Sequence, residues 1–213
     1  KVYLEGKEIH WDKQEITELR QKIGLVFQEA DSQLIAGTVE SEVSFGPMNL
    51  KISEDDVRER VEDALGNMGL KTLRKRAPHY LSGGEKKRVS IADVLAMRPR
   101  MLLMDEPASS LDPFNCGMLK ENLDKLSGQG MGLVIATHDI DFAWEWAERI
   151  LIFHDGVIEA DGQPEEIFAR KELLERCRLK KPLLFQVGQI YGVKPIPRTI
   201  EELKSGMEKE RVD

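Results

Sequence analysis

Residues 80–88 read Tyr-Leu-Ser-Gly-Gly-Glu-Lys-Lys-Arg and lead into an apolar helical pattern that runs to Pro99. The two glycines after Ser82 let the backbone approach a ligand closely. The helix that follows would point its N–H groups and the positive end of its dipole at an anion. The alternative is an ordinary serine-capped helix with a flexible lead-in. We therefore treat residues 82–84 as a candidate anion-binding turn.

Polar side chains follow three apolar strands predicted elsewhere in the sequence. Gln28 follows the strand 22–27, Asp105 and Glu106 follow the strand 101–104, and His138 comes after the strand 132–136. Ligands of parallel α/β sheets bind at the carboxyl ends of strands. Asp105 is of the type that holds magnesium through water, and Glu106 of the type that activates a water as general base. Taken singly, these residues also fit a solvated loop, a helix cap or a structural histidine.

The order of the predicted elements indicates an α/β fold with a mostly parallel sheet. We divide the chain into a β-rich remnant with a core strand (1–30), a helical part (31–98), an α/β core (99–164) and a C-terminal extension (165–213). Within the helical part, Ser53 is expected to cap a helix whose apolar face runs from Val57 to Met68.

Composition narrows the classes of function. The 213 residues carry a formal net charge of -7, which disfavours binding to phosphate backbones. We expect no nucleic-acid partner. The sequence contains no stretch of about 20 uncharged apolar residues, as a membrane span requires. Its two cysteines, Cys116 and Cys177, have no metal-ligand spacing, and we interpret them as reduced thiols.

Taken together, these motifs resemble those of the ATP-binding cassette proteins across residues 22–162. Residues 81–85 are similar to the family's signature motif, with Glu85 where Gln is commonest. The similarity extends to the Walker B strand (101–106), the D-loop (Ser110, Leu111, Asp112), the switch histidine (His138) and the Q-loop (Gln28). The resemblance implies a P-loop NTPase (RecA-like) core with an inserted helical signature subdomain.

The resemblance also implies residue roles in an ATPase. The cofactors would be ATP and Mg²⁺, in a head-to-tail dimer where each signature turn closes on ATP held by the other subunit. The ATP-binding residues would be Ser82, Gly83, Gly84, Glu85 and Asp112; the metal-binding residues Asp105 and Gln28; and the catalytic residues Glu106, His138 and Gln28.

Within the family, residues 26–33, 43–47 and 81–92 resemble the ATPases of energy-coupling-factor importers, above all those for cobalt and nickel. This implies membrane transport subunits bound at a groove near Gln33, a second ATPase subunit, identical or paralogous, and a peripheral place on the cytoplasmic face of the membrane. Ala30 and Ser32 depart from the commoner Pro and Asn. The region 165–213 resembles an extension that helps some importer ATPases to pair.

A phosphate-binding G-x-x-x-x-G-K-[ST] loop is missing from the sequence, since Gly6-Lys7 is followed by Glu8. We expect that the chain as given starts inside its domain, after this loop. We also expect that it binds no ATP by itself and that apolar surface is exposed where the missing strand and helix would pack.

Two rival functions stay open. One is a DNA-repair type of ATPase, disfavoured because about 50 residues between Gln28 and Ser82 leave no room for coiled-coil arms. The other is a non-catalytic module.

We interpret Lys86-Lys87-Arg88 as a solvated helix face, with nucleotide or partner contact as the alternative. Trp144, Trp146 and Phe142 are interpreted as packing residues, with a recognition patch as the alternative.

Overall fold

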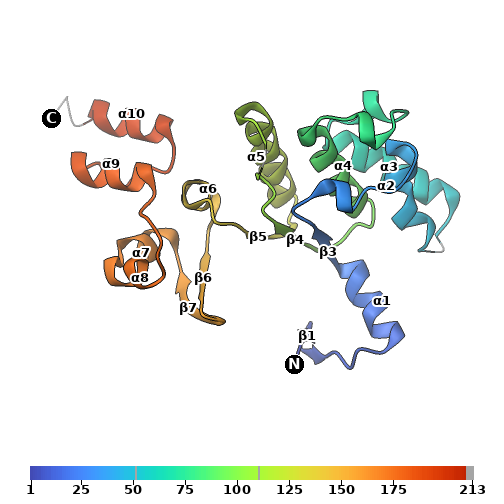
Figure 1. The fold of residues 1–213 in the computed structure, drawn as a ribbon, viewed down its shortest axis with the longest axis horizontal. Helices are drawn as coiled ribbons and strands as arrows, with labels where there is room; N and C mark the ends of the chain where they lie inside the picture. Colours follow the sequence, from blue (N-terminus) through green and yellow to red (C-terminus); the bar gives the residue numbers. More distant parts are fainter. Residues whose placement is uncertain (51, 110, 210–213) are drawn as a thin grey trace. The chain divides into compact units, whose positions relative to one another are not determined.

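The computed structural model describes residues 1–50, 52–109 and 111–209. The chain forms two compact units, residues 1–136 and 137–213, and each is described by itself (Figure 1). The four-part division expected from the sequence stays a prediction.

A parallel three-stranded sheet lies in the first unit. Its strands are β3 (Ile23–Val26), β4 (Met101–Asp105) and β5 (Gly132–Ala136), in the order β3-β4-β5. In the register, Val26 lies opposite Met104, and Asp105 lies opposite Ala136. The predicted α/β class with a parallel sheet is confirmed, and the carboxyl ends of all three strands lie at one edge.

One face of this sheet packs against helix α4 (Gly83–Leu95). A Cβ atom at Gly24 would lie 2.2 Å from Val94 Cγ1, so strand β3 approaches α4 closely only because this position is glycine. Val26, Leu102 and Met104 are buried, as expected for strands covered by a helix. Helix α5 (Pro113–Gly128) connects β4 to β5, as a crossover between parallel strands requires.

The helical part of the first unit also contains α2 (Val39–Met48) and α3 (Glu54–Asn67). Ser53 caps α3 as predicted, since its hydroxyl accepts a hydrogen bond from Asp56 N at 3.1 Å. Val43 and Leu65 are fully buried where these helices pack with α4. Short 3-10 turns lie at Ala30–Ser32, Lys71–Leu73 and Pro78–Tyr80.

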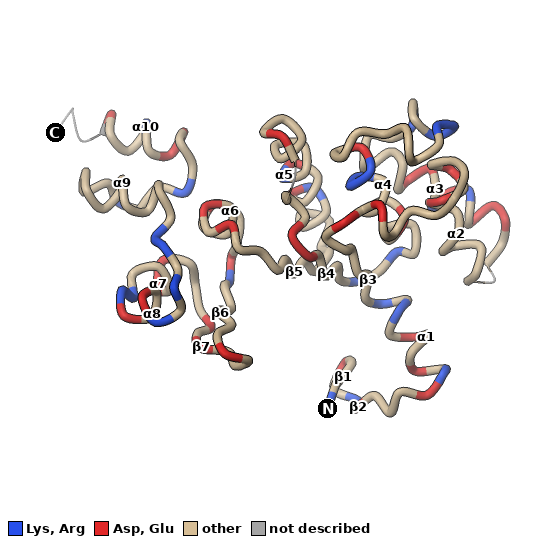
Figure 2. Tube along the Cα trace, viewed as in Figure 1, with Lys and Arg blue, Asp and Glu red and all other residues tan. Residues whose placement is uncertain are grey.

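Helix α1 (Lys13–Lys22) was not predicted in this β-rich stretch. It follows the short antiparallel pair β1 (Tyr3–Leu4) and β2 (Lys7–Glu8) and is capped by Asp12. The helix buries no residue, so it lacks the apolar face that reveals a helix in a sequence. Figure 2 shows charges of both signs along it, and Lys22 pairs with both Glu18 and Glu5.

The second unit combines a hairpin with five helices among its described residues. Its elements are α6 (Ile140–Trp146), β6 (Ile150–His154), β7 (Val157–Gly162), α7 (Pro164–Ala169), α8 (Lys171–Arg176), α9 (Leu183–Tyr191) and α10 (Ile200–Lys209). Strands β6 and β7 pair antiparallel, as the predicted turn at residues 154–156 requires. Trp144 is buried against Phe168 and Phe185, in agreement with its interpretation as a packing residue.

Candidate functional site

The serine-glycine turn forms the first residues of α4. Ser82 is the N-cap residue: its hydroxyl accepts from Glu85 N at 3.3 Å, and the Glu85 carboxylate accepts from Ser82 N at 2.8 Å. This reciprocal pair is a capping box. Ser82 and Gly83 are exposed, whereas Gly84 is buried. The structure thus shows the serine-capped helix, which keeps the positive end of its dipole at the exposed turn. Anion binding at this turn stays a prediction.

Gly84 brings this turn against the start of α5. A Cβ atom at Gly84 would lie 2.4 Å from Asn115 Cγ, so a larger residue does not fit without movement. Asn115 in turn is bonded to Asp112, which caps α5: its N and Nδ2 atoms donate to the two Asp112 carboxylate oxygens at 2.9 and 2.6 Å. These hydrogen bonds, the backbone one first, hold the pKa of Asp112 below its ordinary value. The structure thus brings residues 82–84 and Asp112 together through Asn115. Ser110 of the predicted D-loop lies outside the described residues.

The strand-end residues Gln28, Asp105 and Glu106 lie at neighbouring ends of β3 and β4. Asp105 is the last residue of β4, and Gln28 comes two residues after β3; both are exposed. Glu106 has a φ of 42°, which is uncommon for a residue with a side chain. Its N–H donates to Ala136 O at 2.9 Å, and its carbonyl accepts from Ser109 N and Ser109 Oγ. Backbone contacts on both sides therefore hold Glu106 in an unusual conformation, which is common at functional sites.

His138 follows β5 by two residues and is exposed, but it belongs to the second unit. Next to it, Asp139 N donates to Thr137 Oγ1 at 3.1 Å, and the Asp139 carboxylate caps α6 by accepting from Asp141 N and Phe142 N. The start of α6 is thereby fixed directly after His138. Because His138 and Glu106 belong to different units, their positions relative to each other are not determined.

Three residues that hold parts of the predicted site in place, Lys87, Glu42 and Asn115, were not identified from the sequence. Lys87 is only 3% exposed, and its ammonium donates to Phe27 O at 2.9 Å and Gln28 O at 2.7 Å. The interpretation of residues 86–88 as a solvated face is therefore wrong for Lys87. Position 87 lies three residues after Gly84 and four before Ile91, and both of these residues are buried. This helical spacing was the signal in the sequence that Lys87 lies on the buried face of the helix.

For Glu42 and Asn115, no spacing in the sequence indicated a role in holding the site. Glu42 is 3% exposed, and its carboxylate accepts from Ile35 N at 2.8 Å and from Ala36 N. It holds the segment after Gln33 against α2. A buried acid that binds backbone N–H groups cannot be distinguished in the sequence from a solvated acid on a helix.

The donor atoms at the strand ends fit a hydrated Mg²⁺. Carboxylate and amide oxygens are its preferred protein ligands, and it usually retains several waters. Asp105 and Gln28 supply such oxygens from adjacent strand ends and are exposed. Across residues 1–50, 52–109 and 111–209, no three His, Cys, Asp or Glu side chains cluster as a dedicated metal site. A metal here would be held together with a ligand rather than by protein alone.

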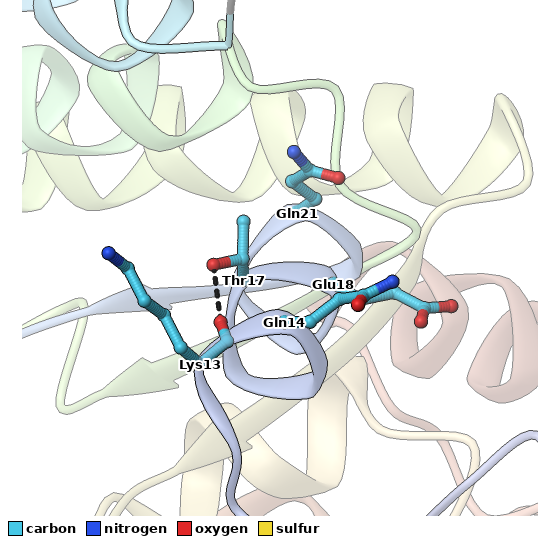
Figure 3. Close-up of a pocket in the computed structure, with 5 residues that line it drawn as sticks. All are labelled: Lys13, Gln14, Thr17, Glu18 and Gln21. Atoms are coloured by element: carbon cyan, nitrogen blue, oxygen red, sulfur yellow. Dashed lines mark hydrogen bonds between the residues drawn. The ribbon is translucent and has the colours of Figure 1, made fainter.

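A surface hollow of about 470 Å³ lies along α1, away from these residues. Lys13, Gln14, Thr17, Glu18 and Gln21 line it. Figure 3 shows that all five belong to one helix, and the hydrogen bond drawn there runs from Thr17 Oγ1 to Lys13 O of the same helix. Among the described residues, only side chains of α1 line the hollow, and we assign no ligand to it.

Comparison with known proteins identifies the family. The family model described as ABC transporter matches residues 1–109. An ATP-binding protein of this kind from Methanothermobacter marburgensis, described as a putative ABC transporter protein, is 41% identical over 96% of this chain and 76% of its own length. The chain belongs to the ABC transporter family.

Relatives with more specific names are similar as well. The energy-coupling factor transporter ATP-binding protein EcfA2 of Methanospirillum hungatei is 46% identical over 208 residues, 95% of this ABC-family chain. The chain spans only 52% of the length of that relative. It covers 69% of EcfA from Methanocaldococcus jannaschii, which is 38% identical over 91% of this chain.

Solved structures confirm the P-loop NTPase fold of this ABC-family chain. The cbiO1 protein of Clostridium perfringens, part of the ABC transporter complex cbiONQ, aligns with a TM-score of 0.74 and 36% identity over 90% of this chain and 75% of its own. An ATP-binding cassette solved as a dimer in a post-hydrolysis state with ADP and Pi aligns with a TM-score of 0.65 and 32% identity, covering 76% of this chain and 72% of its own.

Proposed function

We propose that this chain is the ATP-binding and hydrolysing part of a subunit that powers an energy-coupling-factor importer. The observation that carries the proposal is the parallel pairing of β3 with β4, because the ends of these strands, with Gln28 after one and Asp105 and Glu106 at the other, lie at one edge of the sheet. The relatives named as energy-coupling factor ATP-binding proteins support the same function.

In the proposed reaction, the residues of this chain act at two ATP sites of the dimer. Glu106 takes a proton from the attacking water as general base, and Gln28 orients that water. Asp105 and Gln28 would hold Mg²⁺, which neutralises phosphate charge when bound. His138 would contact the transferred group. The Gly83 and Gly84 N–H groups, Ser82, Glu85 and Asp112 would contact ATP held by a second subunit.

Dimer closure is the proposed working stroke. The exposed turn at Ser82 and Gly83 supports this, because a turn that acts on the nucleotide of another subunit must face outward. The second ATPase subunit is identical or paralogous.

By itself, the 213-residue chain is proposed to be inactive, since its sequence contains no G-x-x-x-x-G-K-[ST] loop. Calorimetry of the chain with Mg²⁺ and ATP should give no heat of binding; micromolar affinity would contradict this.

The decisive test replaces Glu106 in the intact subunit. Glu106→Gln should lower steady-state ATP hydrolysis by about 10²–10⁴-fold, because the amide cannot accept the proton of the water. ATP binding should persist, so the variant should elute as an ATP-dependent dimer in size-exclusion chromatography. Glu121→Gln, an exposed position on α5, is the matched control and should retain full activity. Undiminished hydrolysis by Glu106→Gln would refute the assigned role.

The proposed membrane partner binds at the surface that follows Gln33. Ile35, Phe45 and Met48 are 75%, 58% and 69% exposed. Phe45 and Met48 lie three residues apart on α2, and the Glu42 carboxylate holds the Ile35 N–H against this helix. Exposed apolar side chains grouped in this way are typical of an interaction site. We propose that an apolar helix of a membrane transport subunit binds there, on the cytoplasmic face of the membrane; none of the described helices is long and apolar enough to cross it.

The proposed cargo is the cobalt or nickel ion. Residues 26–33 and 81–92 support this proposal by their resemblance to the ATPases of such importers. Uptake of radiolabelled cobalt and nickel should stop in cells that carry Glu106→Gln. Unchanged uptake of both, together with lost uptake of another nutrient, would overturn the choice of cargo while leaving the ATPase proposal intact.

A further inference from the structure

Lys87 is a buried lysine of helix α4 with two backbone carbonyl partners. Its side chain is 3% exposed, and a buried ammonium is costly unless hydrogen bonds replace its hydration. The Nζ atom donates to Phe27 O at 2.9 Å and to Gln28 O at 2.7 Å. Burial lowers the pKa of Lys87, and the nearby Asp105 carboxylate opposes this shift. The ammonium thus joins the helix to the chain at the end of β3.

The two carbonyls belong to a segment that has left the sheet. Strand β3 ends at Val26, so Phe27 and Gln28 have passed beyond its ladder. Carbonyl groups in irregular segments need partners from elsewhere, and here Lys87 supplies both. Because one of them is the carbonyl of Gln28 itself, the ammonium fixes the backbone from which the Gln28 side chain projects.

Gln33 forms a second connection between this segment and α4. Its Nε2 atom donates to Ser90 O at 2.9 Å and to Asp93 Oδ2 at 3.3 Å, while its Oε1 atom accepts from Phe27 N at 3.4 Å. Residues 87, 90 and 93 follow one another at three-residue intervals, which places them on neighbouring parts of one helix surface. Both ends of the segment 27–33 are therefore bound to α4.

The same helix carries the exposed turn at its start. Ser82 and Lys87 are five residues apart, a rise of roughly 7.5 Å along a rigid helix. A movement of the turn therefore passes directly to Lys87.

We propose that Lys87 is a positioning residue that binds the segment 27–33 to α4, so that Gln28 and the turn 82–84 move as one body. The contacts stand independently of any reaction; only the consequence for ATP hydrolysis rests on the proposed function. In that reaction, closure of the turn on the nucleotide of a second subunit would shift Gln28 in its own site.

Hydrogen–deuterium exchange of the protein tests this connection without nucleotide. Lys87→Met keeps the apolar stem and removes the ammonium, which leaves two carbonyls without their donor. Amides of residues 27–36 should then exchange about tenfold faster or more, while those of α3 keep their rates. Lys86→Met is the matched control on the adjacent residue. It removes a third contact between α4 and the segment, the ion pair to Asp31. Because Asp31 is 72% exposed, this pair should contribute little, and exchange should change less than about twofold.

A second variant keeps the test decisive if Lys87→Met does not fold. Gln33→Leu removes the connection through Gln33 and should also accelerate exchange in residues 27–36 selectively. Unchanged exchange in this segment, or an equal rise in the segment and in α3, would overturn the proposal, because the contacts would then only stabilise the unit as a whole.

Kinetics of the intact subunit adds a readout that separates positioning from binding. Lys87→Met should lower kcat and leave KM for ATP within about twofold, since Lys87 contacts the backbone rather than nucleotide. A KM effect alone would contradict the positioning role. If the unmodified subunit hydrolyses no ATP, the proposed function fails, yet the exchange experiment still decides whether Lys87 holds the segment.

Discussion

The two units of the chain bury different kinds of side chain. In the second unit, Trp144 packs edge to face against Phe168 and Phe185, with ring centroids 5.0 Å apart for Trp144 and Phe185. In the first unit, Glu42, Lys87 and Ser90 are the buried polar side chains of the described part of the chain. Apolar packing is non-directional and stabilises a unit as a whole. Directed hydrogen bonds instead fix one irregular segment in one position, which is what a strand-end site requires.

The largest expected effect comes from removing a ring of the aromatic cluster in the second unit. Trp144→Ala should lower the free energy of unfolding of the second unit by about 4 kcal/mol, because it leaves a cavity beside Phe185. It also removes the hydrogen bond from Trp144 Nε1 to Pro197 O. Native-state hydrogen exchange of α9 amides measures this loss. Leu183→Ala, at a position 64% exposed, is the control with little expected change. An equal loss of protection in the first unit would show that the units do not unfold separately.

The next effect concerns the close approach of two helix starts in the first unit. Gly84→Ala should cost about 3 kcal/mol, the upper part of the range for overpacking, because the new Cβ meets Asn115. Exchange of α4 and α5 amides reports the loss. Gly84→Ala with Asn115→Ala should recover most of it, since the second change removes the obstructing atoms. If the double variant is as unstable as the single one, the helix starts are not in contact as described.

The smallest expected effect concerns a buried polar group of the first unit and depends on pH. Burial raises the pKa of Asp93 to about 6, while the hydrogen bond from Gln33 opposes the shift and Glu42 adds to it. A carboxyl whose pKa is higher in the folded state destabilises it once ionised, so stability should fall as pH rises from about 4 to 6. Asp93→Asn should therefore stabilise the first unit by about 2 kcal/mol at pH 7.5, and the gain should vanish near pH 4.

Native-state exchange of α4 amides across this pH range measures the gain. Asp55→Asn, at a carboxylate with a 93% exposed side chain, is the control, and its effect should stay within about 0.5 kcal/mol at each pH. A gain for Asp93→Asn that does not depend on pH would contradict the titration of Asp93.

The sequence predicted what depends on local pattern. The strand ahead of Asp105, the Ser53-capped helix and the hairpin around Gly156 follow from apolar periodicity, capping and turn residues, and all three are present. The parallel sheet, and with it the proximity of Gln28 to Asp105, followed from the alternation of elements. Helix α1 escaped prediction because a polar helix without a buried face has no periodic signal.

The contacts that hold the candidate site were not predictable, because they join residues far apart in the chain. Nothing local to Lys87 indicates that its partners lie about sixty residues earlier. In the same way, Gly84 indicated a turn in the sequence, but only the structure shows that Asn115 occupies the space beside it. Charge and residue type give the list of polar residues, whereas burial decides which of them bind backbone groups.

The position of Lys87 also gives the protein an internal chemical reporter. An amine that donates to two carbonyls inside the unit cannot be acylated by a reagent in solution until the segment 27–33 separates from α4. Lys71 of the same unit, whose side chain is 62% exposed, supplies a reference amine. The ratio of labelling at Lys87 and Lys71, read by mass spectrometry, therefore measures how often the segment opens, with no dye, spin label or engineered cysteine.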